Sequence, residues 1–211
     1  MDVDEIISGM MSRWRIIAVM SRLQYLIDNN IEGDIVELGC NIGTLSMYIQ
    51  KLLAENNSDK VYHVYDSWQG LPSPTEQDEH EFDRKFKEGS CSTTIEKFVH
   101  TFTSRNLRVP VIHSGWFKDI PSREFPDKIC FAFFDGDFYQ SIIDSFEKVY
   151  YNMVPGGVIM VDDCGWKILP GVIKACEDFL SDKPEELMLT GYPDENGNYG
   201  EPNNGGLIIK G

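Results

Sequence analysis

The chain has 211 residues, of which 42% are hydrophobic and 25% charged, and its formal net charge is -15. This length and composition are typical of one globular domain with a sizeable core. The negative charge argues against binding to nucleic-acid phosphates, which requires a basic surface, and it disfavours anionic membrane surfaces. The five cysteines are scattered without CxxC spacing, which indicates reduced thiols and neither a disulfide framework nor a zinc site.

The first thirty residues are predicted to form an N-terminal helical segment. Residues 3–29 carry apolar side chains at helical spacing, interrupted at Gly9, so we expect two helical pieces lying against the domain that comes after them. Acidic residues stand where a signal peptide would be basic, and no apolar run approaches the roughly 20 residues that span a bilayer. We therefore expect a cytoplasmic protein without membrane insertion.

From residue 34 onward, short β-branched runs alternate with amphipathic stretches, the pattern of a parallel sheet with crossover helices. The predicted strands are residues 34–38, 61–65, 109–113, 129–134, 158–161 and 207–210, with a helix end and another strand start within 179–189. The predicted helices are residues 44–55, 92–105, 140–151 and 170–180. We also expect a tight turn at 155–157 and long loops at 70–90 and 192–206, all within a single domain spanning 1–211.

A glycine-containing loop follows the first predicted strand. The sequence Glu37-x-Gly39-x-x-x-Gly43 leads from that strand directly into a helix. Glycines permit a sharp turn and a close approach of ligand to backbone, and the helix N-terminus offers free N–H groups. The spacing differs from the GxGxxG dinucleotide pattern and from the GxxxxGK[ST] phosphate loop. A ligand-binding loop that includes Asn41 is favoured, and a purely structural turn is the alternative.

The second and third strands end in further candidate ligand contacts. Asp66 ends the second strand, where an acid can accept both hydroxyls of a ribose, with Ser67 beside it. A helix or turn cap is the alternative role for Asp66. Ser114 and Trp116 follow the third strand, and we expect them to contact an adenine ring.

Four aspartates follow two apolar strands that should be neighbours in the sheet. Asp135 and Asp137 come after the fourth strand, and Asp162 and Asp163 come after the fifth. Carboxylates gathered at one sheet edge cannot all ionise unless a cation lies among them or their pKa values rise strongly. Ligation by oxygen alone suits Mg²⁺, Ca²⁺ or Mn²⁺ and disfavours zinc. The pattern predicts a metal site, and helix capping by some of these acids is the alternative.

These segments together resemble one family, the macrocin-type (TylF/MycF-type) sugar O-methyltransferases. The resemblance covers about residues 30–180 and depends on the order and spacing of its segments. They are VELGCNIGTLSM (36–47), VYDSWQGLP (64–72), HSGWFKDIP (113–121), FDGDFYQS (134–141), VPGGVIMVDD (154–163) and PGVIKACEDF (170–179). The sequence departs from the family at Cys164, where an aromatic residue is usual.

The resemblance implies a class I methyltransferase, an α/β Rossmann-like fold with a mostly parallel seven-stranded sheet, helices on both faces and an N-terminal helical extension. It implies metal binding, preferably of Mg²⁺, by Asp135, Asp162 and Asp163, with Asp137 as general base. It implies S-adenosylmethionine binding at Glu37, Gly39 and Asp66. The full set of expected cofactor contacts is Glu37, Gly39, Asn41, Gly43, Asp66, Ser67, Ser114, Trp116 and Asp135.

The expected reaction is methylation of a sugar hydroxyl, for example on rhamnose in a glycan or glycoside. Trp68, Tyr139 and Trp166 are candidates to stack against the sugar, and core packing is the alternative role for each. Two alternative functions use the same fold: methylation of a phenolic or catechol acceptor, and a non-catalytic cofactor-binding scaffold. A nicotinamide dehydrogenase is disfavoured by the missing third glycine. A homodimer and a module of a larger glycan-synthesis protein are both compatible with the sequence.

Overall fold

The computed structural model describes residues 3–79, 86–190 and 205–211. Its sheet has seven strands in the order β3-β2-β1-β4-β5-β7-β6. In chain order the strands are β1 (Asp34–Leu38), β2 (Tyr62–Asp66), β3 (Val111–Ser114), β4 (Ile129–Phe134), β5 (Met153–Asp162), β6 (Met188–Thr190) and β7 (Gly205–Ile209). Among the described strands, β7 runs antiparallel to both of its neighbours, β5 and β6, and the other neighbouring pairs are parallel. The expected α/β fold with a mostly parallel seven-stranded sheet is confirmed.

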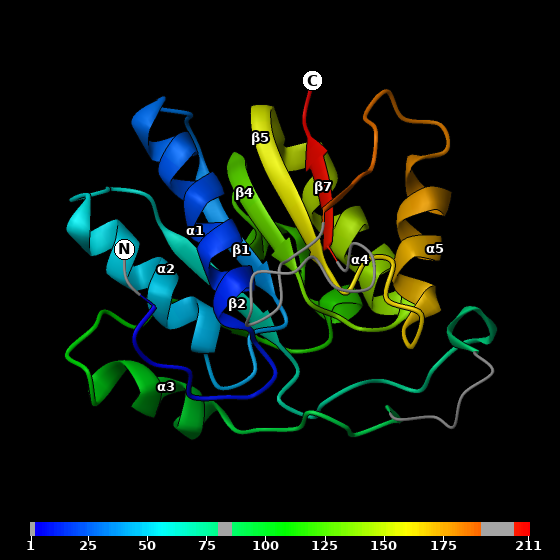
Figure 1. Ribbon diagram of the computed structural model, residues 1–211, viewed down its shortest axis with the longest axis horizontal. Coiled ribbons are helices and arrows are strands. Elements are labelled where there is room, and N and C mark those ends of the chain that lie inside the picture. The colour runs from blue at the N-terminus through cyan, green and yellow to red at the C-terminus, as the bar shows by residue number, and fades with distance from the viewer. Residues whose placement is uncertain (1–2, 80–85, 191–204) are drawn as a thin grey trace.

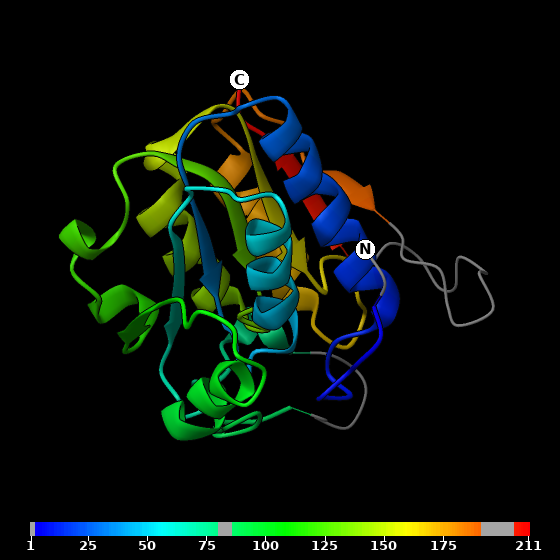
Figure 2. The same cartoon turned by 90° about the vertical axis from the view of Figure 1, so that its left-hand side faces the viewer.

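Helices cover both faces of the sheet (Figure 1). The α-helices are α1 (Arg13–Asp28), α2 (Thr44–Glu55), α3 (Ile95–Thr103), α4 (Tyr139–Val149) and α5 (Pro170–Leu180). Side chains of α1, α2 and α3 pack in one apolar cluster with one face of the sheet, and α4 and α5 pack in a second cluster on the opposite face. Figure 2 shows α1 and α2 lying over the first face. Single-turn 3₁₀ helices cover Glu76–Asp78, Phe117–Asp119, Ser122–Glu124 and Tyr150–Asn152.

The central strands explain why this layered arrangement forms. All six residues of β4 (ICFAFF) are buried, because alternate side chains enter the two clusters. β5 lies beside β4 in parallel, with Phe134 opposite Val161. The carboxyl ends of these two strands therefore lie side by side at the same edge of the sheet, and the residues after them must meet there.

Three local predictions were wrong. Residues 3–12 are not helical, and α1 alone forms the N-terminal helix. A helix as short as this segment would have little stability of its own. Tertiary contacts hold the segment instead: the Glu5 N–H donates to Tyr48 Oη at 2.8 Å, and the Glu5 carboxylate pairs with Arg105.

The second wrong prediction concerns the expected turn at 155–157, which lies inside β5. There Gly156 has φ +76° and its N–H donates to the carbonyl of Lys210, so antiparallel bonding continues past the glycines. The third concerns the end of the expected loop at 192–206, because Gly205 and Gly206 belong to β7 and not to a loop. The rest of the predicted loop from Tyr192 lies outside the described residues.

Candidate active site

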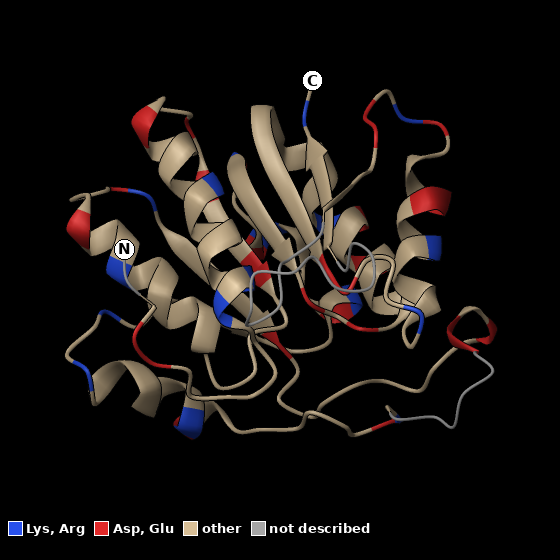
Figure 3. Ribbon diagram, viewed as in Figure 1, with Lys and Arg blue, Asp and Glu red and all other residues tan. Residues whose placement is uncertain are grey.

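Four aspartates lie at the carboxyl edge of the sheet, where β4 and β5 end. Figure 3 shows acidic residues near the lower ends of these strands. Asp137 and Asp163 adopt left-handed backbone conformations, with φ of 59° and 53°. Such conformations are uncommon for residues other than glycine, although aspartate tolerates them better than most. These two turns redirect the chain directly after each strand and bring its acids to one place.

Carboxylate oxygens of Asp135, Asp137 and Asp163 lie within 4.8 Å of one another. Burial raises the pKa of Asp137 to about 8, and the negative charges of Asp163 and Asp162 act in the same direction. Burial likewise raises the pKa of Asp135, with Asp137 and Asp163 adding to the effect. These carboxyl groups resist ionisation because their negative charges would repel one another. A divalent cation bound among them would offset that repulsion, so the cluster is suited to such a cation.

Asp162 lies beside this group but is not one of its three members. Its Oδ2 accepts a hydrogen bond of 2.8 Å from Nη1 of Arg15, and its Oδ1 is buried with no hydrogen-bond partner among the described residues. A buried carboxylate oxygen without a partner is costly. Together with the oxygen-only donor set of its neighbours, this oxygen fits a hard divalent cation at the site.

Arg15 is a residue of this site that the sequence analysis missed. It lies in the first turn of α1 and pairs with both Asp162 and Asp163. Burial opposes its charge, but Asp162, Asp163 and Asp135 outweigh burial and raise the pKa of the guanidinium. The signal available in the sequence was indirect: four acids at one edge require positive charge, and nothing in the pattern distinguished Arg15 from Arg13.

The glycine loop packs tightly between the ends of β1, β2 and β4. Gly39 has φ +90°, and a Cβ at this position would lie 2.0 Å from the backbone oxygen of Asp135. Asp66 holds the loop, because its Oδ2 accepts from the N–H groups of Cys40 and Asn41, each at 3.0 Å. The loop and the aspartate cluster are thus in direct contact, so a cofactor bound at the loop would reach the acids.

A cavity runs from this loop to the aspartates. Seven predicted site residues line it: Gly39, Asn41, Asp66, Ser67, Trp116, Asp135 and Asp137. The same cavity is also lined by residues that were not predicted from the sequence, among them Leu71, Phe117, Gln140 and Asp144. The last two belong to α4, where Gln140 Nε2 donates to Asp144 Oδ1 at 2.8 Å.

Three predicted cofactor contacts do not line the cavity. Glu37 is 2% exposed and accepts hydrogen bonds from Ser46 Oγ, at 2.6 Å, and from Tyr62 Oη. Gly43 precedes α2, where a Cβ would approach the ring of Phe98 to 2.9 Å. Ser114 Oγ accepts from the indole of Trp68. The structure gives each of these residues a packing or hydrogen-bonding role, and their contacts with a cofactor remain predictions.

The three aromatic residues expected at the acceptor are not gathered around this cavity. Trp68 packs against Phe98 with ring centroids 5.4 Å apart. Tyr139 Oη donates to Asp178 at 3.1 Å. The ring of Trp166 meets Phe86 edge-on. Their role in acceptor binding stays a prediction.

Asp78 is a second residue that the sequence analysis did not find. It is 5% exposed, and its Oδ1 accepts from the N–H of Tyr139 at 2.8 Å, the first residue of α4. Its Oδ2 accepts from the N–H and Oγ1 of Thr75. Asp78 thereby ties the segment around the 3₁₀ helix Glu76–Asp78 to the start of α4, two residues after Asp137.

Among the described residues, no helix combines the length and apolar character needed to cross a membrane. The family model described as Macrocin-O-methyltransferase (TylF) matches residues 1–188. A solved structure of the O-methyltransferase NovP superposes with a TM-score of 0.77 at 25% identity, covering 96% of this chain and 81% of that one.

Two curated proteins from Streptomyces are also similar. One, from Streptomyces olivaceus, is 8-demethyl-8-(2,3-dimethoxy-alpha-L-rhamnosyl)-tetracenomycin-C 4'-O-methyltransferase, 27% identical over 174 residues. The other, demethyldecarbamoylnovobiocin O-methyltransferase from Streptomyces niveus, is 30% identical over 145 residues. The matched regions cover 77% and 65% of this chain but only 64% and 55% of the two relatives, so this chain spans less than two thirds of each.

Proposed function

This chain belongs to the macrocin O-methyltransferase (TylF) family, and we propose that it transfers the methyl group of S-adenosylmethionine to a hydroxyl of a sugar. The observation that carries the proposal is the close approach of the glycine loop to Asp135, which lines one cavity together with that loop and Asp137. We propose a deoxyhexose such as rhamnose as the acceptor, and the rhamnosyl substrate in the name of the Streptomyces olivaceus relative supports that choice.

The reaction requires alignment and removal of a proton. The acceptor oxygen forms a bond to the methyl carbon while the bond from that carbon to sulfur breaks, and neutral S-adenosylhomocysteine leaves. Alignment of this kind is worth roughly 7–11 kcal/mol of barrier. We assign the ribose to Asp66 and the adenine to the region of Trp116, because both residues line the cavity. In that arrangement the sulfur would lie toward Asp135.

Asp137 is the proposed general base. Its carboxylate lines the cavity and belongs to the group of clustered oxygens, so it can reach a hydroxyl held between the cofactor and the acids. General-base assistance is typically worth about 10²–10⁴-fold. The proposed metal ligands are Asp135, Asp162 and Asp163; a divalent cation such as Mg²⁺, once bound there, supplies positive charge that orients the hydroxyl and lowers its pKa.

An acceptor screen tests the proposal. Purified protein is incubated with S-adenosylmethionine, Mg²⁺ and either rhamnosides or catechols, and mass spectrometry detects the added methyl group. We expect methylated rhamnoside, and at least about a hundredfold slower turnover for Asp137→Asn. The matched control is Asp59→Asn, which removes an exposed acid remote from the cavity and should leave the rate unchanged.

The outcomes separate the candidate functions. Methylation of catechols without methylation of rhamnosides would show that the acceptor is a phenolic compound and not a sugar. Binding of S-adenosylmethionine without methylation of either class would favour a non-catalytic scaffold.

A further inference from the structure

Arg15 bridges the two aspartates that end β5. Its Nη1 donates to Oδ2 of Asp162 at 2.8 Å, and its Nη2 donates to Oδ1 of Asp163. The side chain of Arg15 is 12% exposed, and those of Asp162 and Asp163 are 2% and 10% exposed. This contact is therefore a buried one, in which a planar guanidinium fork joins two separate carboxylates and is little screened by solvent.

The backbone of α1 fixes the position of this guanidinium. Ser12 caps the helix, with its Oγ accepting from the N–H of Arg15 at 3.2 Å. The next residue, Ile16, is fully buried, as is Val19 one turn later. These residues pack α1 against the sheet, where it contacts both β4 and β5. The arginine thus enters the cluster from an anchored helix and not from a flexible loop.

Full ionisation of all four aspartates would require more positive charge than Arg15 supplies. Among the described residues, Arg15 pairs with Asp162 and Asp163, and the carboxyl groups of Asp135 and Asp137 lie beside Asp163. Removing one partner of a buried ion pair leaves an uncompensated charge and is strongly destabilising. Arg15 therefore supports the folded protein whenever no metal is bound.

The same contacts should oppose metal binding. The guanidinium occupies one oxygen of Asp162 and one of Asp163 and leaves Asp162 Oδ1 buried and without a partner among the described residues. A divalent cation at these acids would share its ligands with a neighbouring positive charge, and like charges repel strongly where water is excluded.

We propose that Arg15 is a resident counter-ion of the aspartate cluster, which stabilises the metal-free protein and lowers the affinity of the site for a divalent cation. Arg15 is a positioning residue, because it acts through Asp162 and Asp163. The inference rests on the metal site of the proposed function and adds to it a residue that sets how much free metal the enzyme requires.

The test compares Arg15→Gln with wild type in two measurements that do not involve catalysis. Calorimetry with MgCl₂ alone measures metal affinity, and urea denaturation in EDTA measures the stability of the metal-free protein. We expect Arg15→Gln to bind Mg²⁺ at least about tenfold more tightly and to unfold at a lower urea concentration in EDTA. Saturating Mg²⁺ should restore most of the lost stability.

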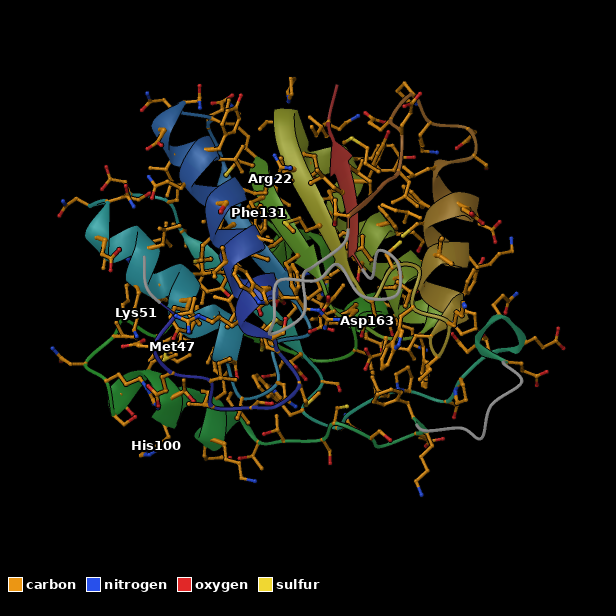
Figure 4. All side chains as sticks on the ribbon, viewed as in Figure 1. Arg22, Met47, Lys51, His100, Phe131 and Asp163 are labelled. Carbon is orange, nitrogen blue, oxygen red and sulfur yellow. The ribbon has the colours of Figure 1, made fainter. Side chains whose placement is uncertain are left out.

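Arg22→Gln is the matched control, because Arg22 lies on the same helix and is exposed. Figure 4 labels Arg22 farther along α1, away from Asp163. This variant loses the same charge and should change neither measurement. Arg15→Lys keeps the charge without the fork and tests the proposal if Arg15→Gln does not fold: we expect tighter Mg²⁺ binding than wild type, by a smaller factor.

Each outcome has one meaning. Equal or weaker Mg²⁺ binding by Arg15→Gln, or by Arg15→Lys where the first variant is unfolded, would overturn the counter-ion role and leave the proposed methyl transfer intact. If neither wild type nor any variant binds Mg²⁺, both the metal in the proposed function and its competition with Arg15 are wrong. Unchanged stability of folded Arg15→Gln in EDTA would overturn the stabilising part of the role.

Discussion

The buried Glu37 should make the stability of this protein depend on pH. Burial raises the pKa of its carboxyl from 4.5 to about 7, although Ser46 and Tyr62 donate to it. The folded state therefore holds the proton more tightly than the unfolded state. Stability attributable to this group is fully present below pH 4.5, and it is lost progressively as the pH rises toward 7.

The size of the effect can be calculated from the two pKa values. The difference between 4.5 and about 7 corresponds to ~3 kcal/mol, since one pKa unit is worth about 1.4 kcal/mol. At pH 5.5 the Glu37 carboxyl of the unfolded chain is already mostly ionised, so part of the stability has been lost by then. The free energy of unfolding should fall by a further ~2 kcal/mol between pH 5.5 and 8.5. Gln at this position keeps the shape and cannot ionise, and the two hydroxyl neighbours can reverse their hydrogen bonds to suit it.

Urea denaturation of wild type and Glu37→Gln across that pH range tests the prediction. The free energy of unfolding of wild type should fall by ~2 kcal/mol relative to the variant as the pH rises, because the contributions of other groups cancel in the difference. If the two proteins keep a constant difference from pH 5.5 to 8.5, Glu37 does not have a raised pKa in the folded state and the reasoning fails.

Two further substitutions test the contacts that hold the site. Gly39→Ala should lose at least about 2 kcal/mol of stability and most S-adenosylmethionine binding, since its Cβ would meet the Asp135 backbone at 2.0 Å. Gly89 also has a positive φ but has open space around it, so Gly89→Ala should lose only the stability that the unfavourable backbone conformation costs. Equal losses in the two variants would show that the contact between position 39 and the Asp135 backbone does not matter. Asp78→Ala should lose about 1–3 kcal/mol and slow methyl transfer, because it leaves the Tyr139 N–H without its acceptor. A rate and a urea midpoint that match those of wild type would show that the α4 tether is dispensable.

Much of the fold could be predicted because the sheet is strongly patterned. The strand Ile129–Phe134 and the helices Thr44–Glu55 and Pro170–Leu180 match the predicted bounds, since uninterrupted apolar runs and clear amphipathic stretches have few alternatives. The clustering of the four aspartates could be predicted as well, because neighbouring parallel strands end at the same edge of the sheet. The sheet itself therefore determines where the residues beyond each strand end are placed.

The missed features depend on contacts between residues far apart in the sequence. Arg15 reaches Asp162 across 147 positions, and Asp78 reaches Tyr139 across 61. No local pattern encodes either pair. The non-helical stretch at 3–12 was mispredicted for the same reason, because contacts with Tyr48 and Arg105 outweigh its helical spacing. Glu37 shows the converse: its motif position is recognisable, but Ser46 and Tyr62 determine where its carboxylate points.

The proposed function depends above all on metal-dependent methyl transfer at the aspartate cluster. The most direct test measures methylation of a rhamnoside by wild type, by wild type treated with EDTA and by Asp162→Asn, alongside S-adenosylmethionine binding by calorimetry. We expect EDTA and the substitution each to abolish methylation while S-adenosylmethionine still binds, and Mg²⁺ to restore the EDTA-treated enzyme. Full methylation by Asp162→Asn or in excess EDTA would contradict the metal-dependent mechanism.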